Sequence, residues 1–96
     1  MATEKYILVQ MYSERTQIES EFLRNLNDYG LVKLEERENE VFMDEKDISE
    51  IERLFRLHRD LGINYEGLDV IKQMLQRMNS LEKEIEYLQK KLRLYE

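Results

Sequence analysis

Residues 41–62 read VFMDEKDISEIERLFRLHRDLG, and this stretch contains the clearest local signals in the chain. It opens with the β-prone run Val41 to Met43. Asp44 follows as a candidate N-cap, with further acids in the first helical turn, where the helix dipole favours negative charge. An apolar stripe then predicts one amphipathic helix that ends at Gly62. Its expected buried face consists of Ile48, Ile51, Leu54, Phe55, His58 and Leu61.

A second amphipathic helix is predicted on the N-terminal side of this stretch, over residues 17–29. Gly30 follows it at the position where a left-handed C-cap is expected. Ahead of the helix, Met11 to Thr16 form a short polar stretch in which Ser13 is a candidate N-cap. Tyr6 to Val9 predict either a short strand or an extended approach to the first helix. The buried stripe of the 17–29 helix is expected to consist of Ile18, Phe22, Leu23 and Leu26.

A small acidic wing is predicted between these two helices. The β-prone runs Val32 to Leu34 and Val41 to Met43 flank a polar connection of hairpin length, residues 35–40. This charge run is either a solvated loop or a surface for a basic helix or a cation. A calcium loop is disfavoured because the glycine turn and the glutamate at position twelve are missing. The acids of the connection are Glu35, Glu36, Glu38 and Glu40.

The segment from Tyr65 to the C-terminus carries apolar residues at alternating spacings of three and four, the heptad pattern of a coiled coil. Asn79 and Ser80 mark a candidate bend within it. A lone helix leaves such a seam in water, so the pattern predicts a homodimer, with folding back of the segment onto the rest of the chain as the alternative. The seam positions are Ile71, Met74, Met78, Leu81, Ile85, Leu88, Leu92 and Tyr95.

Two features of the seam favour a parallel orientation of the dimer. Isoleucine recurs at heptad position a with leucine at d, the combination typical of parallel two-stranded coils. The potential interhelical pairs Arg77–Glu82 and Lys91–Glu96 suit the same arrangement.

Charge is divided unevenly along the chain. Its 15 Lys and Arg against 21 Asp and Glu give a formal charge of −6. Residues 1–64 hold 15 acids and 9 bases, whereas residues 65–96 hold six of each. We therefore predict an acidic head, residues 1–64, and a C-terminal segment, residues 65–96, suited to self-association. The acidity argues against nucleic-acid binding and is compatible with a basic protein partner.

Several kinds of chemistry lack the residues they require. The chain has no cysteine and one histidine, so no thiolate or His-rich metal site can form. His58 lies on the apolar stripe of its helix and is expected to pack there, and its spacing from Ser49 and Asp60 does not form a triad. We expect no enzymatic activity, no cofactor and no metal. Without an apolar run of ~20 residues or a signal peptide, the expected location is the cytoplasm.

Several short motifs resemble those of the MerR superfamily. Phe22-Leu23-Arg24 and Tyr29-Gly30-Leu31-Val32 resemble the end of the second MerR helix and the approach to the wing. Arg56-Leu57, Leu61-Gly62-Ile63, Glu66 and Val70-Ile71 resemble the signature that joins the last two helices. The resemblance implies a mainly α fold, a MerR-like winged helix-turn-helix with a small β-hairpin wing and a C-terminal coiled-coil dimerisation helix. It also implies an antiparallel crossing of the two dimer helices.

The chain departs from DNA-binding MerR regulators in its charges. Their second helix and wing carry Arg and Tyr directed at phosphates. Here the corresponding helix has Glu19, Glu21 and Asp28 against the single Arg24, and the wing has four glutamates against one arginine. Such acids would repel a phosphate backbone.

Within the superfamily, the small size and the lack of an effector domain are similar to the chaperone modulators of the CbpM type. That resemblance implies binding to the basic J-domain of a DnaJ-like (CbpA-type) co-chaperone, which masks its DnaK-binding surface. Acidic side chains on the modulator are the expected complement. The residues expected to contact the J-domain are Glu35, Glu36, Glu38, Glu40, Asp44 and Glu45.

Two other functions stay open at this point: a small MerR-like transcriptional regulator that binds DNA as a dimer, and a plain oligomerisation module. Arg53, Arg56 and Arg59 recur at a spacing of three and, with Lys46, form a modest basic row. The row is either a residual nucleic-acid face or, as we expect, a set of partners for neighbouring acids in the same helix.

Overall fold

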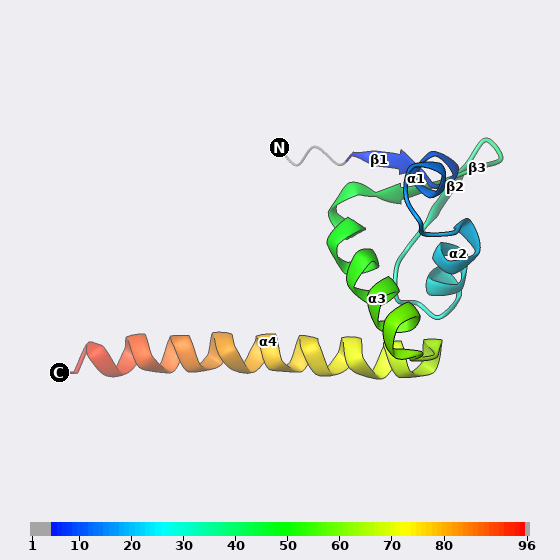
Figure 1. The fold of residues 1–96 in the computed structure, drawn as a ribbon. Helices are drawn as coiled ribbons and strands as arrows, with labels where there is room; N and C mark the ends of the chain where they lie inside the picture. Colours follow the sequence, from blue (N-terminus) through cyan, green and yellow to red (C-terminus); the bar gives the residue numbers. More distant parts are fainter. Residues whose placement is uncertain (1–4, 96) are drawn as a thin grey trace.

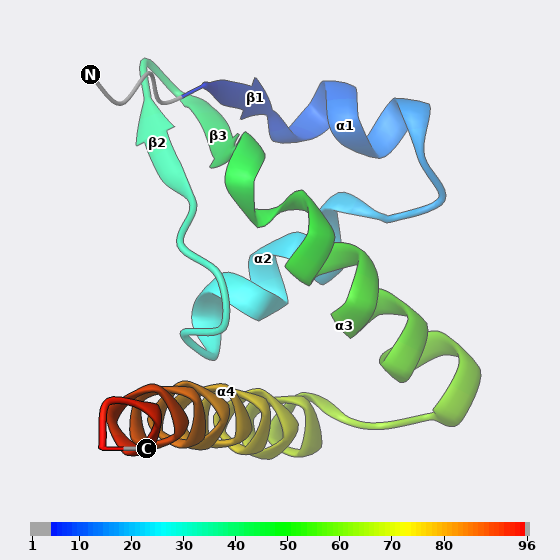
Figure 2. The same ribbon diagram turned by 90° about the vertical axis from the view of Figure 1, so that its left-hand side faces the viewer.

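The computed structural model describes residues 5–95, in which three helices and a small sheet form the head while a fourth helix projects from it (Figures 1 and 2). The helices are α1 (Val9–Arg15), α2 (Ser20–Asp28), α3 (Ile48–Leu61) and α4 (Tyr65–Arg93). The strands are β1 (Tyr6–Leu8), β2 (Glu35–Arg37) and β3 (Glu40–Asp44). This is the predicted mainly α, winged helix-turn-helix architecture.

The wing is part of a three-stranded antiparallel sheet in the order β1-β3-β2, rather than a two-stranded hairpin. Residues 6–8 form a strand because they pair with β3, where Ile7 lies opposite the buried Met43. This pairing satisfies backbone groups along an edge of β3 that a two-stranded wing would leave open.

The predicted boundaries of the first wing strand are wrong. Strand β2 begins at Glu35 and β3 at Glu40, so four residues of the expected six-residue connection are strand, and the turn consists of Glu38 and Asn39. Both turn residues have positive φ, 50° and 68°, as in the two-residue hairpin turns that match strand twist. Val32 and Leu34 stay outside the strand: Val32 is buried in the core, and the Leu34 N–H donates to the Asn27 side chain at 3.0 Å.

Helix α1 occupies the stretch that the sequence presents as polar, with Ser13 inside it rather than at an N-cap. Val9 and Tyr12 are both buried, one helical turn apart, and their packing outweighs the weak local signals. The Thr16 hydroxyl donates to the Tyr12 carbonyl at 2.9 Å and accepts from the Ile18 N–H at 3.2 Å, which ends the helix.

Helix α2 begins at Ser20, three residues later than expected. It buries Phe22, Leu23 and Leu26 of the predicted stripe, whereas Ile18 is buried in the segment just before it. Gly30 has a φ of 72°, so the predicted left-handed C-cap is confirmed. The Leu31 N–H then donates to the Leu26 carbonyl at 2.8 Å, the reversal that returns the chain to the core.

Helix α3 ends at Gly62 as predicted, but it begins at Ile48, because a 3-10 turn takes the place of the expected first helical turn, and its last apolar residue points outward. The Asp44 carboxylate accepts from the Lys46 N–H at 3.0 Å and caps the 3-10 turn Glu45–Asp47 that leads into α3. Gly62 ends the helix with a φ of 65°. The chain reversal at Gly62 places Ile63 against the core beside Leu57, and Leu61, expected to be buried, is 69% exposed.

Replacing Gly62 with Ala is expected to lower the free energy of unfolding by about 1 kcal/mol, because an L-residue resists the left-handed conformation. A Cβ at this position would meet no atom within 4 Å, so the loss reports backbone strain alone. Urea denaturation followed by circular dichroism measures it. Gly62→Asn is the control and should lose clearly less, since asparagine tolerates this conformation; equal losses for the two variants would contradict the explanation.

Helix α4 is continuous, so the bend considered at Asn79 and Ser80 is absent from Tyr65–Arg93. Both residues are exposed, and their modest helix propensities, less favourable than Ala by about 0.5 kcal/mol each, do not interrupt a long helix. The molecule measures 58 × 38 × 21 Å, and its radius of gyration of 17.3 Å exceeds the roughly 12.5 Å of a compact chain of this length. The C-terminal part of α4 therefore extends away from the head and does not fold back onto it.

The first turns of α4 are bound to the head. Leu68 is fully buried, and the Lys72 ammonium donates to the Leu31 carbonyl. The Tyr29 hydroxyl donates to Glu66 at 2.9 Å. Asn64 caps the helix by accepting from the Gly67 N–H at 2.8 Å. The core thus continues into α4; its buried members are Val9, Tyr12, Ile18, Phe22, Leu23, Leu26, Leu31, Val32, Met43, Ile51, Leu54 and Leu68.

Candidate functional site

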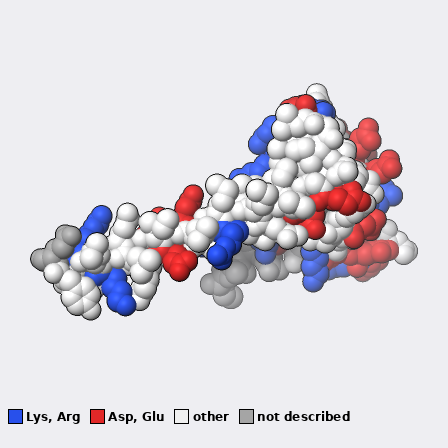
Figure 3. Space-filling model, turned by 90° about the horizontal axis from the view of Figure 1, so that it is seen from below, with Lys and Arg blue, Asp and Glu red and all other residues white. Residues whose placement is uncertain are grey.

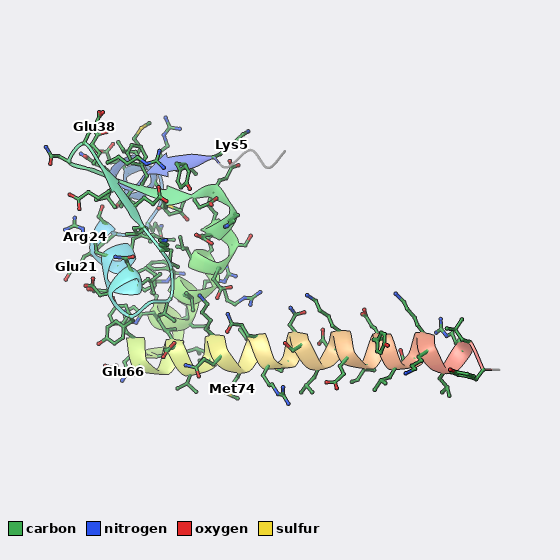
Figure 4. All side chains as sticks on the ribbon, turned by 180° about the vertical axis from the view of Figure 1, so that it is seen from behind. Lys5, Glu21, Arg24, Glu38, Glu66 and Met74 are labelled. Atoms are coloured by element: carbon green, nitrogen blue, oxygen red, sulfur yellow. The ribbon has the colours of Figure 1, made fainter. Side chains whose placement is uncertain are left out.

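The four wing glutamates lie on different sides of the sheet. Arg37 pairs with Glu40 across the strands and Glu35 with Phe42, so Glu35 and Glu40 share one face. Glu36 lies opposite Val41 and therefore points to the other face. Glu38 occupies the turn (Figure 4). The structure brings these acids to one end of the sheet without joining them into a single flat patch.

The wing acids also differ in how freely they can meet a partner. Glu35 already pairs with Arg37, with Oε2 at 2.8 Å from Nη2, and it is half-buried. Glu36, Glu38 and Glu40 are exposed. These three are the wing acids most available to a basic partner.

Asp44 and Glu45 lie at the opposite end of β3 from the turn. Asp44 is largely buried and pairs with Lys46 at 3.6 Å in addition to its capping bond. Glu45 is exposed, and its N–H donates to the Lys5 carbonyl at 2.9 Å. Burial, followed by the nearby Asp44 carboxylate, raises the pKa of Asp47. Asp44 thus has a structural role, whereas Glu45 is open to solvent.

Helix α2 presents acidic side chains where a DNA-reading helix would present cations. Glu19, at its N-cap, and Glu21 and Asp28 are exposed. Glu21 and Arg24 project from the outer side of α2, along the same edge of the head as Glu38 (Figure 4). The wing tip and α2 together form an edge in which acids outnumber bases.

A cluster of five rings joins α2, α3 and the start of α4, and sequence reasoning did not find it. The ring of Phe22 lies 5.4 Å from Phe55 and 5.4 Å from His58, and His58 stacks on Tyr65 at 4.9 Å. Tyr29 stacks on Tyr65 at 5.4 Å. Phe22, Phe55 and His58 were each expected in the core, but nothing in the sequence brings Tyr29 and Tyr65 to them.

His58 packs in this cluster as predicted. Its Nδ1 lies 2.7 Å from the Ile63 carbonyl oxygen, so Nδ1 carries the proton and donates. The Asn25 side chain donates to the Tyr65 hydroxyl at 3.0 Å. The hydrogen bond from Tyr29 to Glu66 raises the pKa of the Tyr29 hydroxyl. These bonds fix the rings in place.

The basic row of α3 pairs in part with neighbouring acids, as expected. Arg53 lies 4.0 Å from Glu50, and Arg59 lies 2.9 Å from Asp60. Arg59 also donates to Gln17 at 3.2 Å, which ties α3 to the segment before α2.

The predicted seam residues lie along one side of α4. Ile71, near the head, is half-buried, and the other seven, Met74 to Tyr95, are between 40% and 82% exposed. Met74 is labelled on the side of α4 away from the head (Figure 4), and Figure 3 shows this underside as mostly uncharged. Glu96, considered as a partner of Lys91, lies outside the described residues. The head covers a different side of α4, the one that carries Leu68 and Lys72.

Residues 5–95 contain neither a metal site nor a membrane-spanning helix. In this part of the chain, no group of three potential ligand side chains converges as a metal site requires. None of its helices combines the length and the hydropathy needed to cross a membrane.

These features define a winged helix-turn-helix head followed by a long helix with an open apolar seam. The sequence model of the MerR HTH family of regulatory proteins matches residues 7–90. The chain therefore belongs to the MerR HTH family of regulatory proteins. No curated protein matches the chain.

Proposed function

We propose that this member of the MerR family is a chaperone modulator that binds the J-domain of a DnaJ-like (CbpA-type) co-chaperone. The observation that carries the proposal is the acidic edge formed by α2 and the wing, where a DNA reader of this family needs cations. A basic protein surface is the electrostatic complement of that edge. The modulator acts by covering the DnaK-binding surface of the J-domain, without catalysis, and the proposal places both proteins in the cytoplasm.

The proposed contact surface is the wing: Glu35, Glu36, Glu38 and Glu40, with Asp44 and Glu45 at the far end of β3. Because Asp44 is largely buried and capping, the exposed Glu36, Glu38 and Glu40 contribute most to steering. The proposal includes a homodimer through the α4 seam, which would present two acidic heads to separate partners.

A small transcriptional regulator that binds DNA as a dimer is the second candidate. The family match itself favours it, since the family is described as one of regulatory proteins. Arg24 on α2 and Lys33 before the wing are exposed cations that could contact phosphates. The neighbouring acids Glu19, Glu21 and Glu38 argue against DNA binding, because they would repel the phosphates.

Reversing Glu36, Glu38 and Glu40 to Lys is expected to weaken binding to an isolated J-domain by about tenfold or more and to flatten its salt dependence. Glu35 is spared because of its pair with Arg37. Isothermal titration calorimetry at several salt concentrations measures the effect. The matched control reverses Glu82, Glu84 and Glu86 on the projecting part of α4, an equal change in charge, and should leave affinity within about twofold.

Two outcomes would contradict this proposal. Equal affinity of the wing variant and the wild type would move the contact surface away from the wing. Tight binding of duplex DNA at physiological salt, with none of the J-domain, would favour the transcriptional regulator instead.

A further inference from the structure

A groove of about 590 Å³ opens on the head between the start of α2, the last turns of α3 and the first residue of α4. Its walls come from three elements that are distant in sequence, including Glu19, Glu21, Phe22, Phe55, Arg59 and Tyr65. Neither the wing contact nor the α4 seam uses this groove.

One wall of the groove is aromatic and rigidly held. Phe22, Phe55, His58 and Tyr65 all line it, and successive ring centroids lie 4.9 to 5.9 Å apart. The Tyr65 hydroxyl and the His58 Nδ1 have hydrogen-bond partners within the protein, so the ring positions are set before any ligand arrives. Aromatic faces attract cations, guanidinium groups most often.

The rim of the groove is acidic. Glu19 and Glu21 line it and are exposed, and among residues 5–95 neither of them forms an ion pair. Among the described residues that line the groove, Arg59 is the single cation, and Asp60 already pairs with it at 2.9 Å. The groove therefore has two carboxylates available for a cation from outside.

The protein itself shows how a guanidinium group fits this wall. The Arg59 guanidinium carbon lies 5.0 Å from the centre of the Phe55 ring, while Nη1 donates to Gln17 at 3.2 Å. The combination of an aromatic face with a polar acceptor at the edge suits a planar guanidinium better than a compact ammonium. The Tyr65 ring does not offer a second such face, because it is stacked on His58 at 4.9 Å and on Tyr29 at 5.4 Å. A guanidinium from outside would therefore take the Phe55 face in place of Arg59, with Glu19 and Glu21 as the carboxylates that line the same groove.

We propose that this groove is an anchor site for one arginine side chain of the basic protein partner. The guanidinium stacks on the aromatic wall and pairs with Glu19 or Glu21, which makes the groove a second contact in addition to the wing. The inference rests on the proposed function insofar as the partner is a basic protein, and it does not depend on which basic protein that is.

N-acetyl-arginine amide is the probe for this site, followed by amide shifts in nuclear magnetic resonance spectra of the full chain. Shifts are expected at residues 17–25, 55–59 and 65, and Glu19→Gln with Glu21→Gln should weaken binding by about fivefold. The matched control is Glu84→Gln with Glu86→Gln on α4, which should leave affinity unchanged. Arg59→Gln removes the resident cation and is expected to strengthen binding of the probe.

Three results would overturn the anchor site. The first is equal shifts with the uncharged N-acetyl-norleucine amide, and the second is stronger binding of N-acetyl-lysine amide. The third is no shift at these residues at probe concentrations in the tens of millimolar. Circular dichroism spectra that match the wild type establish that each variant is folded.

The anchor site and the chaperone-modulator proposal can fail separately. Probe binding in the groove without J-domain binding would keep the anchor site and change the partner. J-domain binding that is lost in the wing variant but unchanged by Glu19→Gln with Glu21→Gln would keep the modulator function and remove the anchor site.

Discussion

The double variant Ile85→Lys, Leu88→Lys is expected to sediment as a monomer at tens of micromolar, where we expect the wild-type chain to sediment as a dimer. Both residues are 54% exposed in the single chain and occupy adjacent a and d positions of the seam. Burying each such side chain contributes about 1.5–3 kcal/mol, and seven exposed seam residues on each of two chains outweigh the cost of association. Two lysines at the centre would place charges in the dry part of that interface.

The control for the seam variant adds the same charge on another side of α4. Asn79→Lys with Ser80→Lys changes two exposed polar residues outside the seam and should leave the dimer intact. The head of the seam variant should keep its fold, because neither Ile85 nor Leu88 belongs to the core. A wild-type chain that sediments as a monomer would contradict the homodimer.

Replacing Leu68 with Ala is expected to lower the free energy of unfolding by about 2–5 kcal/mol, the largest stability effect we predict for a single substitution. Leu68 is 0% exposed and is the buried residue that α4 contributes to the core. The total free energy of unfolding of a native protein is about 5–15 kcal/mol, so the loss at Leu68 is a large share of that total. Chemical denaturation followed by helix content measures it.

Leu61→Ala is the matched control, the same substitution at a leucine that is 69% exposed. Its cost should stay within about 1 kcal/mol, since little apolar area leaves the core. Equal costs at the two positions would mean that α4 does not dock on the head as the structure shows.

Local signals predicted most of the helices because they depend on neighbours within one or two turns. Asp44 caps its own next turn, and Gly30 and Gly62 adopt the positive φ that ends α2 and α3. The heptad predicted α4 for the same reason, and only the suggested bend was wrong. The family resemblance supplied the order of the elements, which the family match supports.

Errors arose where a residue's environment comes from distant parts of the chain. Residues 9–15 form α1 because Val9 and Tyr12 find a core to pack against, although their local sequence is polar. The first wing strand is displaced because Asn27, on α2, binds the backbone at Leu34. Local periodicity shows neither the core that packs against Val9 and Tyr12 nor the Asn27 side chain that binds the backbone at Leu34.

By itself the sequence determined the C-terminal ends of α2 and α3, the buried faces of α2 and most of α3, the apolar seam and the acidity of residues 1–64, because each follows from spacing or composition. Only the tertiary structure decided that Glu36 points away from Glu35 and Glu40 and that α4 presents its seam away from the head. It also decided that Tyr65 meets Phe22 and His58 beside Glu19 and Glu21. These relations depend on strand register and helix packing, which bring residues together across separations of about 40 positions.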